Sequence, residues 1–446
     1  GIRNELAYNR QSSFGDVDGD GWLDIAIGCD NIKNAYGGFP HSRLYVFRPR
    51  GHNFIDGHFE DIGGSDLVPD FGGFYHDSER DKAGPDIDLR DLDNDRDLDL
   101  LQSCHVDVRE PLLDYSPGEY RQGMMCWKNL VRETGELRFE KVTGNGLHCE
   151  ARLRYDRTKQ VYEPASDARA PGLPYVALAD VNHDGLMDVF AVGPNSPYWA
   201  PRIEDVSGRF WKNLGDFRFQ EMTGAVGLDA IDNTLRQWHA FFEAPTPQRF
   251  VNWRPRGRYP SQPGLTPSHP LGRHPYYADA IFGDFNNDGW LDVVVLDRAE
   301  RPESRAILWM GQADGTFECQ PTTLSGLDAG GISGEAADLN NDGLLDLVFA
   351  ADPDNSGVAT DPRRYESRVY WNTGEHNARQ NHWIRICFTG VTHAELIGAR
   401  AEVSTGGRKQ YRWIHSKHTY KSGGALDAHF GLGKATSADI AVSLLN

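Results

Sequence analysis

Short apolar runs rich in β-branched and aromatic residues recur along the chain, each bounded by aspartate and glycine. They stand at 25–28, 189–193, 293–296 and 347–350. Apolar residues also precede the polar stretches in front of these runs, for example at 175–179 and 280–283. Apolar runs of about four to eight residues between turn residues are typical of buried strands. The pattern therefore predicts pairs of β-strands joined by a polar loop.

The polar loops share one design in five copies, with oxygen-bearing side chains at loop positions 1, 3, 5 and 9. We number them loop 1 (16–24), loop 2 (91–99), loop 3 (180–188), loop 4 (284–292) and loop 5 (338–346). Glycine stands at position 6 in all but loop 2. This spacing wraps side-chain oxygens and the backbone carbonyl of position 7 around a hard divalent cation, above all Ca²⁺. We predict about five Ca²⁺ ions, held by Asp16, Asp18, Asp20, Trp22, Asp24, Asp91, Asp93, Asp95, Asp97, Asp99, Asp180, Asn182, Asp184, Leu186, Asp188, Asp284, Asn286, Asp288, Trp290, Asp292, Asp338, Asn340, Asp342, Leu344 and Asp346.

Position 12 distinguishes these loops from an EF-hand, which requires a bidentate glutamate there. The five loops instead have Ile27, Gln102, Ala191, Val295 and Phe349 at that position. Because position 9 opens an apolar run in each copy, the loop is predicted to connect two strands rather than two helices.

A second signal follows each loop at a similar distance. About thirty residues after the leading aspartate comes an aromatic segment, at 44–47, 126–130, 211–215, 308–311 and 369–374. In the first four copies a turn and another short strand follow it, at 58–62, 138–143, 218–223 and 316–319. One unit is thus strand, calcium loop, strand, strand, turn and strand, which is the make-up of a four-stranded propeller blade. The predicted fold class is all-β, a calcium-binding β-propeller.

The spacing of the loops gives an estimate of the blade number. The closest leading aspartates, Asp284 and Asp338, lie about 54 residues apart, which suits one blade of short strands and tight turns. Residues 1–380 would then hold about seven blades, with six or eight as alternatives. Two of seven blades would lack a calcium loop, most plausibly an insertion within 229–280 and the seam where the N-terminal segment meets the last repeat.

Two parts of the chain resemble known modules. The loops, with Phe-Gly or Ala-Asp in front of them, resemble the FG-GAP/VCBS repeats of integrin α-chain propellers and of many secreted bacterial proteins. Residues 381–446 resemble the small β-domain called ASPIC/UnbV in cartilage acidic protein and its bacterial relatives, through the strings at 383–386, 397–403, 406–412 and 429–433. This resemblance implies a propeller over 1–380 followed by an ASPIC/UnbV-like β-domain over 381–446.

Charge and composition restrict the expected partners and cellular location of the protein. The formal net charge is −19, and five Ca²⁺ ions would reduce it to about −9, so much of the acidity is ligand charge. Nucleic acid is not an expected partner, because a basic footprint is missing. No apolar run approaches a membrane span and no N-terminal leader is visible. We expect a secreted, extracellular or cell-surface protein, where millimolar calcium would fill the loops. The six cysteines lack CxxC spacing; disulfides among Cys104, Cys126 and Cys149 and buried free thiols are equally open.

The five loops are not equivalent. Loops 3 to 5 carry Asn at position 3, which removes one charge each and should weaken their affinity. In loop 2 Arg96 replaces glycine at position 6, where a left-handed backbone is expected at a cost of roughly 1–2 kcal/mol. At position 7 of the same loop, Asp97 is expected to contribute only its backbone carbonyl.

Sequence motifs of catalysis are missing: His-Glu-x-x-His, Gly-x-Ser-x-Gly and a phosphate-cradling glycine loop do not occur. His415, His418 and His429 could form a metal cluster, but scattered histidines are the simpler interpretation. His183 at position 4 of loop 3 is expected to point outwards as a bystander. We therefore regard an enzyme as the weaker hypothesis.

Segment 245–275 concentrates arginine and aromatic residues in an otherwise acidic chain, which is typical of interfaces. The predicted partner-binding residues are Arg249, Trp253, Arg254, Arg256 and Arg258. A proline-rich insertion whose arginines pair with the protein's own acidic surface is the alternative. The functional hypothesis is a binding, adhesion or assembly module for protein or glycan, with self-association through the tail as a further option. The alternative is an extracellular polysaccharide lyase-like enzyme or an accessory protein of a biosynthetic cluster.

Overall fold

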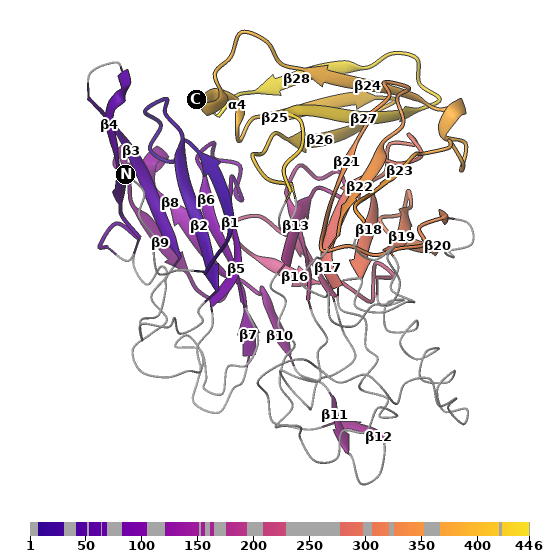
Figure 1. The fold of residues 1–446 in the computed structure, drawn as a ribbon, viewed down its shortest axis with the longest axis horizontal. Helices are drawn as coiled ribbons and strands as arrows, with labels where there is room; N and C mark the ends of the chain where they lie inside the picture. The colour runs from indigo at the N-terminus through magenta and orange to yellow at the C-terminus, as the bar shows by residue number, and fades with distance from the viewer. Residues whose placement is uncertain are drawn as a thin grey trace.

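We analysed the protein in a computed structural model (Figure 1). The structure describes residues 8–30, 42–50, 53–63, 65–68, 83–104, 121–150, 153–156, 161–164, 175–193, 208–228, 277–297, 306–320, 325–351, 366–418 and 422–445. Regular structure among them is almost entirely β, as predicted.

Five antiparallel sheets follow one another along the chain, and within each sheet the strands lie in chain order. Sheet 1 consists of β1 (Tyr8–Gly15), β2 (Asp24–Asp30), β3 (Arg43–Arg50) and β4 (Asn53–Asp61). Sheet 2 consists of β5 (Ala83–Arg90), β6 (Asp99–Cys104), β8 (Met125–Asn129) and β9 (Phe139–Val142). Sheet 3 consists of β13 (Tyr175–Ala179), β14 (Asp188–Val192), β15 (Gly208–Asn213) and β16 (Phe219–Glu221).

The last two sheets repeat this arrangement, although sheet 5 has three strands. Sheet 4 consists of β17 (Tyr277–Gly283), β18 (Asp292–Asp297), β19 (Ala306–Gly311) and β20 (Phe317–Gln320). Sheet 5 consists of β21 (Ser333–Ala337), β22 (Asp346–Ala350) and β23 (Arg368–Tyr370). These meanders have the make-up of propeller blades.

Each aspartate-rich loop joins the first and second strands of one sheet, as the sequence predicts. The residue before the loop pairs directly with the position 9 aspartate in every copy. The pairs are Gly15 with Asp24, Arg90 with Asp99, Ala179 with Asp188, Gly283 with Asp292 and Ala337 with Asp346. The loop is therefore a closed turn whose last ligand position belongs to the second strand.

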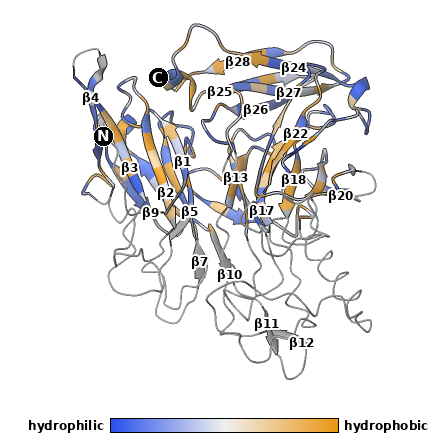
Figure 2. Cartoon of the chain, viewed as in Figure 1, coloured by the Kyte–Doolittle hydropathy of each residue, from blue (hydrophilic) through white to orange (hydrophobic). Residues whose placement is uncertain are grey.

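The hydrophobic core lies between neighbouring sheets. Separate clusters join sheets 1 and 2, sheets 2 and 3, sheets 3 and 4, and sheets 4 and 5. The third strands of sheets 2, 3 and 4 each supply a fully buried tryptophan, Trp127, Trp211 and Trp309. Figure 2 shows the hydrophobic residues along strands such as β2, β18 and β22. Face-to-face burial of these aromatic and β-branched side chains holds consecutive sheets together.

The predicted blade number is not confirmed, because five of the sheets formed by the described residues have the make-up of a blade, against an expected seven. Strand β13 packs directly on β17, and Tyr175 and Tyr277 share one core cluster. Sheets 3 and 4 are therefore direct neighbours. The predicted insertion also ends too late in the sequence, since Tyr277–Ala280 already belong to β17. The rest of the predicted insertion lies outside the described residues.

Two small two-stranded sheets and a short helix lie between the strands of these sheets in the sequence. Strand β7 (Arg121–Gly123) pairs with β10 (His148–Glu150), and β11 (Leu153–Asp156) pairs with β12 (Val161–Pro164). The one-turn helix α1 (Val131–Thr134) stands between the third and fourth strands of sheet 2.

The C-terminal region has a core and sheets of its own. It contains η5 (Ala378–Gln380), β24 (His382–Cys387), α4 (His393–Leu396), β25 (Arg400–Thr405), β26 (Arg408–Trp413), β27 (Asp427–Gly433) and β28 (Asp439–Ser443). Strand β24 pairs with β27, and the order of the other sheet is β26, β25 and β28. Ala399, Val403 and Phe430 are among the buried residues of its core. In Figure 1 these strands lie across one end of sheets 1 to 5.

The structure bears on the predictions about membrane spans and disulfides. Among the described residues, every helix is too short or too polar to cross a membrane. Cys126 is a free, buried thiol, so a disulfide through that residue is wrong. Cys319 and Cys387 are also free thiols. The side chains of Cys104 and Cys149 lie outside the described part of the chain.

Candidate metal centres

The position 1 aspartate organises each loop by accepting hydrogen bonds from the backbone. In loop 4 the Oδ1 atom of Asp284 accepts from the Asp288 N–H at 3.1 Å, and its Oδ2 atom accepts from the Gly289 N–H at 2.8 Å. The same pair of bonds occurs in loops 1, 3 and 5. In loop 2 Asp91 accepts from the Arg96 N–H at 3.2 Å. The chain thus wraps around its first carboxylate.

Positions 3 and 5 fix the next part of the turn. In loop 4 the Asn286 side-chain oxygen accepts from the Asp288 N–H at 3.0 Å, and Asp288 Oδ1 accepts from the Trp290 N–H at 2.8 Å. The bond from position 7 to position 5 is present in all five loops. Because position 7 donates its N–H inward in this way, its backbone carbonyl is held in a fixed place.

The position 9 aspartate joins three segments of each sheet. In loop 4 the Oδ2 atom of Asp292 accepts from the Phe285 N–H at 2.9 Å, while Oδ1 accepts from the Gly311 N–H of the third strand at 2.8 Å. All five copies repeat both bonds, with distances from 2.8 to 3.2 Å. Asp292 and its four equivalents are buried. This carboxylate therefore stabilises the sheet as well as offering oxygen atoms to a cation.

Two left-handed residues give each loop its tight curvature, at positions 4 and 6. Position 6 has φ between 75° and 91° in all copies, and Arg96 has φ 75°. Position 4 has φ between 57° and 74°, with Asn in three loops, Gly in one and His in one. Arg96 thus takes the expected left-handed backbone despite its side chain, which is exposed. The prediction of backbone strain at this position is consistent with that geometry.

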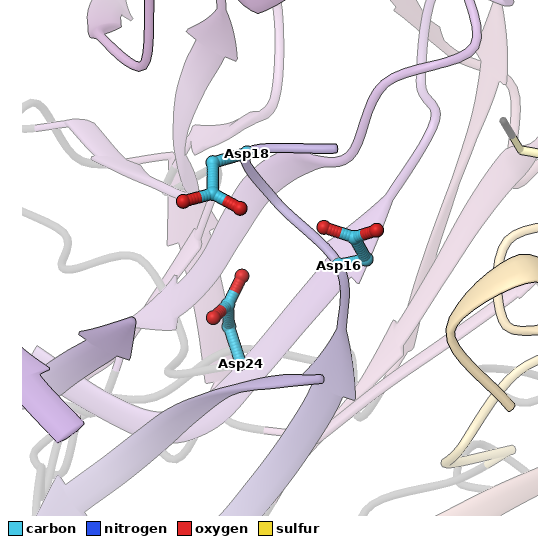
Figure 3. Close-up of side chains that lie close together, drawn as sticks. All are labelled: Asp16, Asp18 and Asp24. Atoms are coloured by element: carbon cyan, nitrogen blue, oxygen red, sulfur yellow. The ribbon is translucent and has the colours of Figure 1, made fainter. Parts of the chain in front are cut away.

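In loops 1 and 2 the carboxylates of positions 1, 3 and 9 converge. One oxygen from each of Asp16, Asp18 and Asp24 lies within 4.8 Å of the others, and the same holds for Asp91, Asp93 and Asp99. Figure 3 shows the carboxylates of loop 1 facing one another at the junction of β1 and β2. Calcium–oxygen distances of about 2.3–2.6 Å allow one ion to reach oxygens with this separation. The donor set is therefore compatible with Ca²⁺ at these two loops.

Loop 1 does not bring all its predicted ligands into that group. Asp20 is exposed and remains outside the set of three close carboxylates. Basic side chains from third strands reach some loops: Arg48 contacts Asp18 at 2.6 Å, and Lys212 contacts Asp184 at 3.2 Å. In loop 4 the amide of Asn286 donates to Asp288 Oδ2 at 2.9 Å. These contacts compensate part of the negative charge of the loops.

Asparagines of the third strands connect neighbouring loops, a role that the sequence analysis missed. The Asn129 amide donates to the Val17 carbonyl of loop 1 at 2.8 Å and to the Leu98 carbonyl of loop 2 at 3.3 Å. Asn213 links loops 2 and 3, and Asn372 links loops 4 and 5, in the same way. Their recurrence after Trp-Lys or Tyr-Trp was the available signal. The loops therefore form a hydrogen-bonded series rather than isolated sites.

The link between loops 3 and 4 has a different chemistry. The third strand of sheet 4 has Gly311 at the asparagine position, and a Cβ there would lie 2.2 Å from the Leu291 carbonyl oxygen. Instead, the His183 ring stacks on Trp290 with centroids 4.4 Å apart and planes inclined by 5°. His183 therefore points away from its own loop, where its ring contacts a neighbouring loop.

The C-terminal region lies directly on loops 3 to 5. In loop 4 the carbonyls of Asn286, Asn287 and Asp288 accept hydrogen bonds at 2.8, 2.8 and 3.0 Å from the Asn381 amide, the Gly433 N–H and the Arg408 guanidinium. The position 6 glycines face the same region in all three loops. A Cβ on Gly289 would lie 1.9 Å from Arg408, one on Gly343 would lie 1.8 Å from Trp383, and one on Gly185 would lie 3.5 Å from Tyr411. Glycine at these positions serves both the left-handed turn and the close approach.

The tail histidines have separate environments. His418 Nδ1 lies 2.9 Å from a Glu335 oxygen, and His429 Nε2 lies 3.3 Å from the Gly343 carbonyl while its ring stacks on Trp383. Among the described residues, no group of three metal-binding side chains includes them. The scattered arrangement expected from the sequence is the one described. Residues Arg249, Trp253, Arg254, Arg256 and Arg258 lie outside the described residues.

Burial makes several of the loop carboxylates resist ionisation without metal. It raises the pKa of Asp24 to about 8, that of Asp91 and Asp284 to about 7, and that of Asp180 to about 6. Neighbouring aspartates raise these values further, whereas backbone hydrogen bonds lower them. A divalent cation would remove this penalty by stabilising the charged forms.

These shifts predict how pH acts on the calcium-free protein. A carboxyl group whose pKa is higher in the folded state stabilises the fold below its unfolded value of about 4. That contribution is lost as pH rises through the folded values of about 6 to 8. Calcium-free protein should therefore lose stability between pH 5 and 8, while the calcium-bound protein should not. Chemical denaturation at several pH values measures this; equal slopes with and without calcium would contradict it.

Comparison with known families connects this geometry to two modules. A family model described as an FG-GAP-like repeat matches residues 284–349, which contain loops 4 and 5. A second model, described as ASPIC and UnbV, matches residues 390–442 in the C-terminal region. The chain carries an FG-GAP-like repeat and a C-terminal ASPIC/UnbV domain. The resemblance drawn from the loops and the tail strings is thereby confirmed. A search of curated proteins gave no match.

Proposed function

We propose that the protein is a secreted, calcium-stabilised scaffold that acts as a binding, adhesion or assembly module. FG-GAP and ASPIC/UnbV modules are extracellular repeat and binding modules, which supports this class of function. In this proposal each of the five loops holds one structural Ca²⁺ through its predicted ligand residues. There, Ca²⁺ would neutralise the charge of the aspartates and fix the geometry of the loop. Partner binding would come from the protein's own side chains. Residues 1–380 form the propeller and 381–446 form the accessory domain.

The main support for the proposal is the packing of the C-terminal region over loops 3 to 5. Arg408 donates to the Asp288 carbonyl at 3.0 Å and its guanidinium lies 5.0 Å from the centre of the Trp290 ring. Trp383 and Tyr411 approach the turns of loops 5 and 3. A catalytic metal needs an open coordination position for substrate or water. Protein groups packed over loops 3 to 5 favour an architectural metal and a scaffold over the lyase-like alternative.

The surface that would contact the partner remains a sequence-based proposal. Segment 245–275 combines arginine with aromatic residues, and we propose that it recognises an anionic glycan or an acidic protein.

Four substitutions test this function. Arg254, Arg256 and Arg258 changed to Ser together with Trp253→Ala should abolish binding to anionic glycans on an array and in pull-downs from producing cells. Wild-type binding should weaken at high salt, because screening shortens the reach of exposed charges. The matched control is Arg379→Ser, an exposed arginine of the C-terminal region, which should bind normally. Binding that survives the four substitutions would move the site elsewhere; calcium-dependent cleavage of a polysaccharide would favour the enzyme.

A further inference from the structure

Sheet 2 carries acidic groups that the other sheets lack. Position 7 of loop 2 is Asp97, whereas the other loops have Trp or Leu there. The Asp97 side chain is not directed into solvent: the residue is 3% exposed. Helix α1 follows the third strand of this sheet and brings Glu133 to the same place. The loop and the helix thus combine two extra carboxylates.

Asp95 and Asp97 are predicted ligands of loop 2, but their carboxylates also group with Glu133, which lies outside the loop. One oxygen each from Asp95, Asp97 and Glu133 lies within 4.8 Å of the others, and this set shares no residue with Asp91, Asp93 and Asp99. At calcium–oxygen distances of about 2.3–2.6 Å, oxygens on opposite sides of one ion are separated by about 5 Å. The geometry is therefore as compatible with a divalent cation as that of the loop group.

The second observation is an oxygen without a partner. Asp97 Oδ2 accepts a hydrogen bond from the Arg132 N–H at 3.3 Å, but its Oδ1 atom is buried and has no hydrogen-bond partner. The carboxylates of Asp95 and Glu133 repel the charge of Asp97 from nearby. A buried, unpaired carboxylate oxygen costs free energy unless a proton or a cation accompanies it.

The contacts of Lys128 compensate only part of the negative charge of these carboxylates. Its Nζ atom contacts Asp93 at 2.5 Å, Asp95 at 3.1 Å and Glu133 at 2.7 Å, and so lies between the two carboxylate groups. Loop 2 has five aspartates, and Glu133 adds a sixth carboxylate. With the Lys128 ammonium and a single Ca²⁺, this group keeps a formal net charge of roughly −3. The three aspartates of loop 4 with one Ca²⁺ keep roughly −1, and a second divalent cation would bring sheet 2 to the same value.

We propose that Asp95, Asp97 and Glu133 form a second divalent-cation site in sheet 2, next to the loop site. The ligand class is a hard, oxygen-binding cation such as Ca²⁺. Lys128 is the positioning residue between the two sites. Asp97 then binds through its side chain, in contrast to the backbone-only role expected from the sequence.

Calcium content after equilibrium dialysis of the full chain tests the proposal. Asp97→Asn and Glu133→Gln should each bind one Ca²⁺ fewer than wild type. Both variants retain the backbone, so the position 7 carbonyl of loop 2 is unchanged. Glu133 is exposed, and its substitution should leave the fold intact even if Asp97→Asn does not fold. The matched control is Glu136→Gln, an exposed glutamate just after the same helix, which should bind the wild-type number.

Asp342→Asn separates this proposal from the five loop sites. It removes a position 5 ligand from loop 5 and should also lose one Ca²⁺, because the loop sites do not depend on Glu133. If Asp342→Asn loses an ion while both sheet 2 variants keep the wild-type number, the second site is overturned and the loop sites stand. If wild type binds no calcium, both proposals fail together.

Discussion

Removing calcium is expected to lower the melting temperature of the protein by more than about 10 °C. A ligand that binds only the folded state adds about 2.7 kcal/mol per site at a hundredfold excess over its Kd. Asn129, Asn213 and Asn372 connect the backbones of neighbouring loops by hydrogen bonds. Loss of calcium from one loop should therefore also destabilise the neighbouring sheets. Without the ion, buried aspartates at positions 1 and 9 must take up protons or remain charged and unpaired.

Thermal melts in chelator and in millimolar Ca²⁺ measure this effect. Chelator with added monovalent salt is the control, because salt screens exposed charges but does not replace a coordinated ion. Salt should restore only a small part of the lost stability. An unchanged melting temperature in chelator, or full recovery with monovalent salt alone, would contradict structural calcium.

The strand–loop–strand unit could be predicted because its signals are local. Oxygen side chains two residues apart, glycine at position 6 and an apolar run from position 9 are all readable in one short window, as in 284–295. The position 9 aspartate was predicted as a ligand, but its bonds to a third strand could not be foreseen. Asp292 reaches Gly311, nineteen residues away, and that contact exists only after the sheet forms.

Contacts between distant segments account for what the sequence did not reveal. The position of the C-terminal region over the loops depends on pairs such as Arg408 with Asp288, 120 residues apart. The grouping of Asp97 with Glu133 depends on helix α1, whose four residues are too few to give a periodic pattern. The blade number stays a prediction, because interval length cannot distinguish a blade from a long connection: β13 contacts β17 directly although loops 3 and 4 are far apart in the sequence.

A buried lysine of the C-terminal region joins that region to the propeller. Lys417 is 3% exposed; its Nζ atom donates to Asp88 at 2.7 Å and also to Asp86. Arg90 pairs with Asp88 at 2.9 Å and donates to the Lys417 carbonyl at 2.7 Å. The adjacent Ser416 exchanges hydrogen bonds with the backbone of Phe14 on β1.

The same segment reaches the last sheet as well as the first two. Ser422 donates to the Gly334 carbonyl at 2.7 Å, and His418 contacts Glu335 at 2.9 Å, both on β21. First strands β1, β5 and β21 are therefore connected through one short piece of the C-terminal region. This arrangement makes the stability of the sheets depend on a residue more than 300 positions away in the sequence.

Lys417→Met is expected to destabilise the protein by about 3–5 kcal/mol, because among the described residues it leaves two buried aspartates with Arg90 as their remaining cation. The loss should be smaller at pH 5 than at pH 8, since the Lys417 ammonium lowers the pKa of Asp86, and without it this buried carboxyl group takes up a proton more readily. Adding Asp86→Asn to Lys417→Met should recover part of the stability by removing one uncompensated charge. Lys409→Met, at an exposed ion pair with Glu402, is the control and should change stability by less than about 0.5 kcal/mol. Denaturation in saturating calcium compares the four proteins; if Lys417→Met unfolds like Lys409→Met, the buried contact does not hold the two regions together.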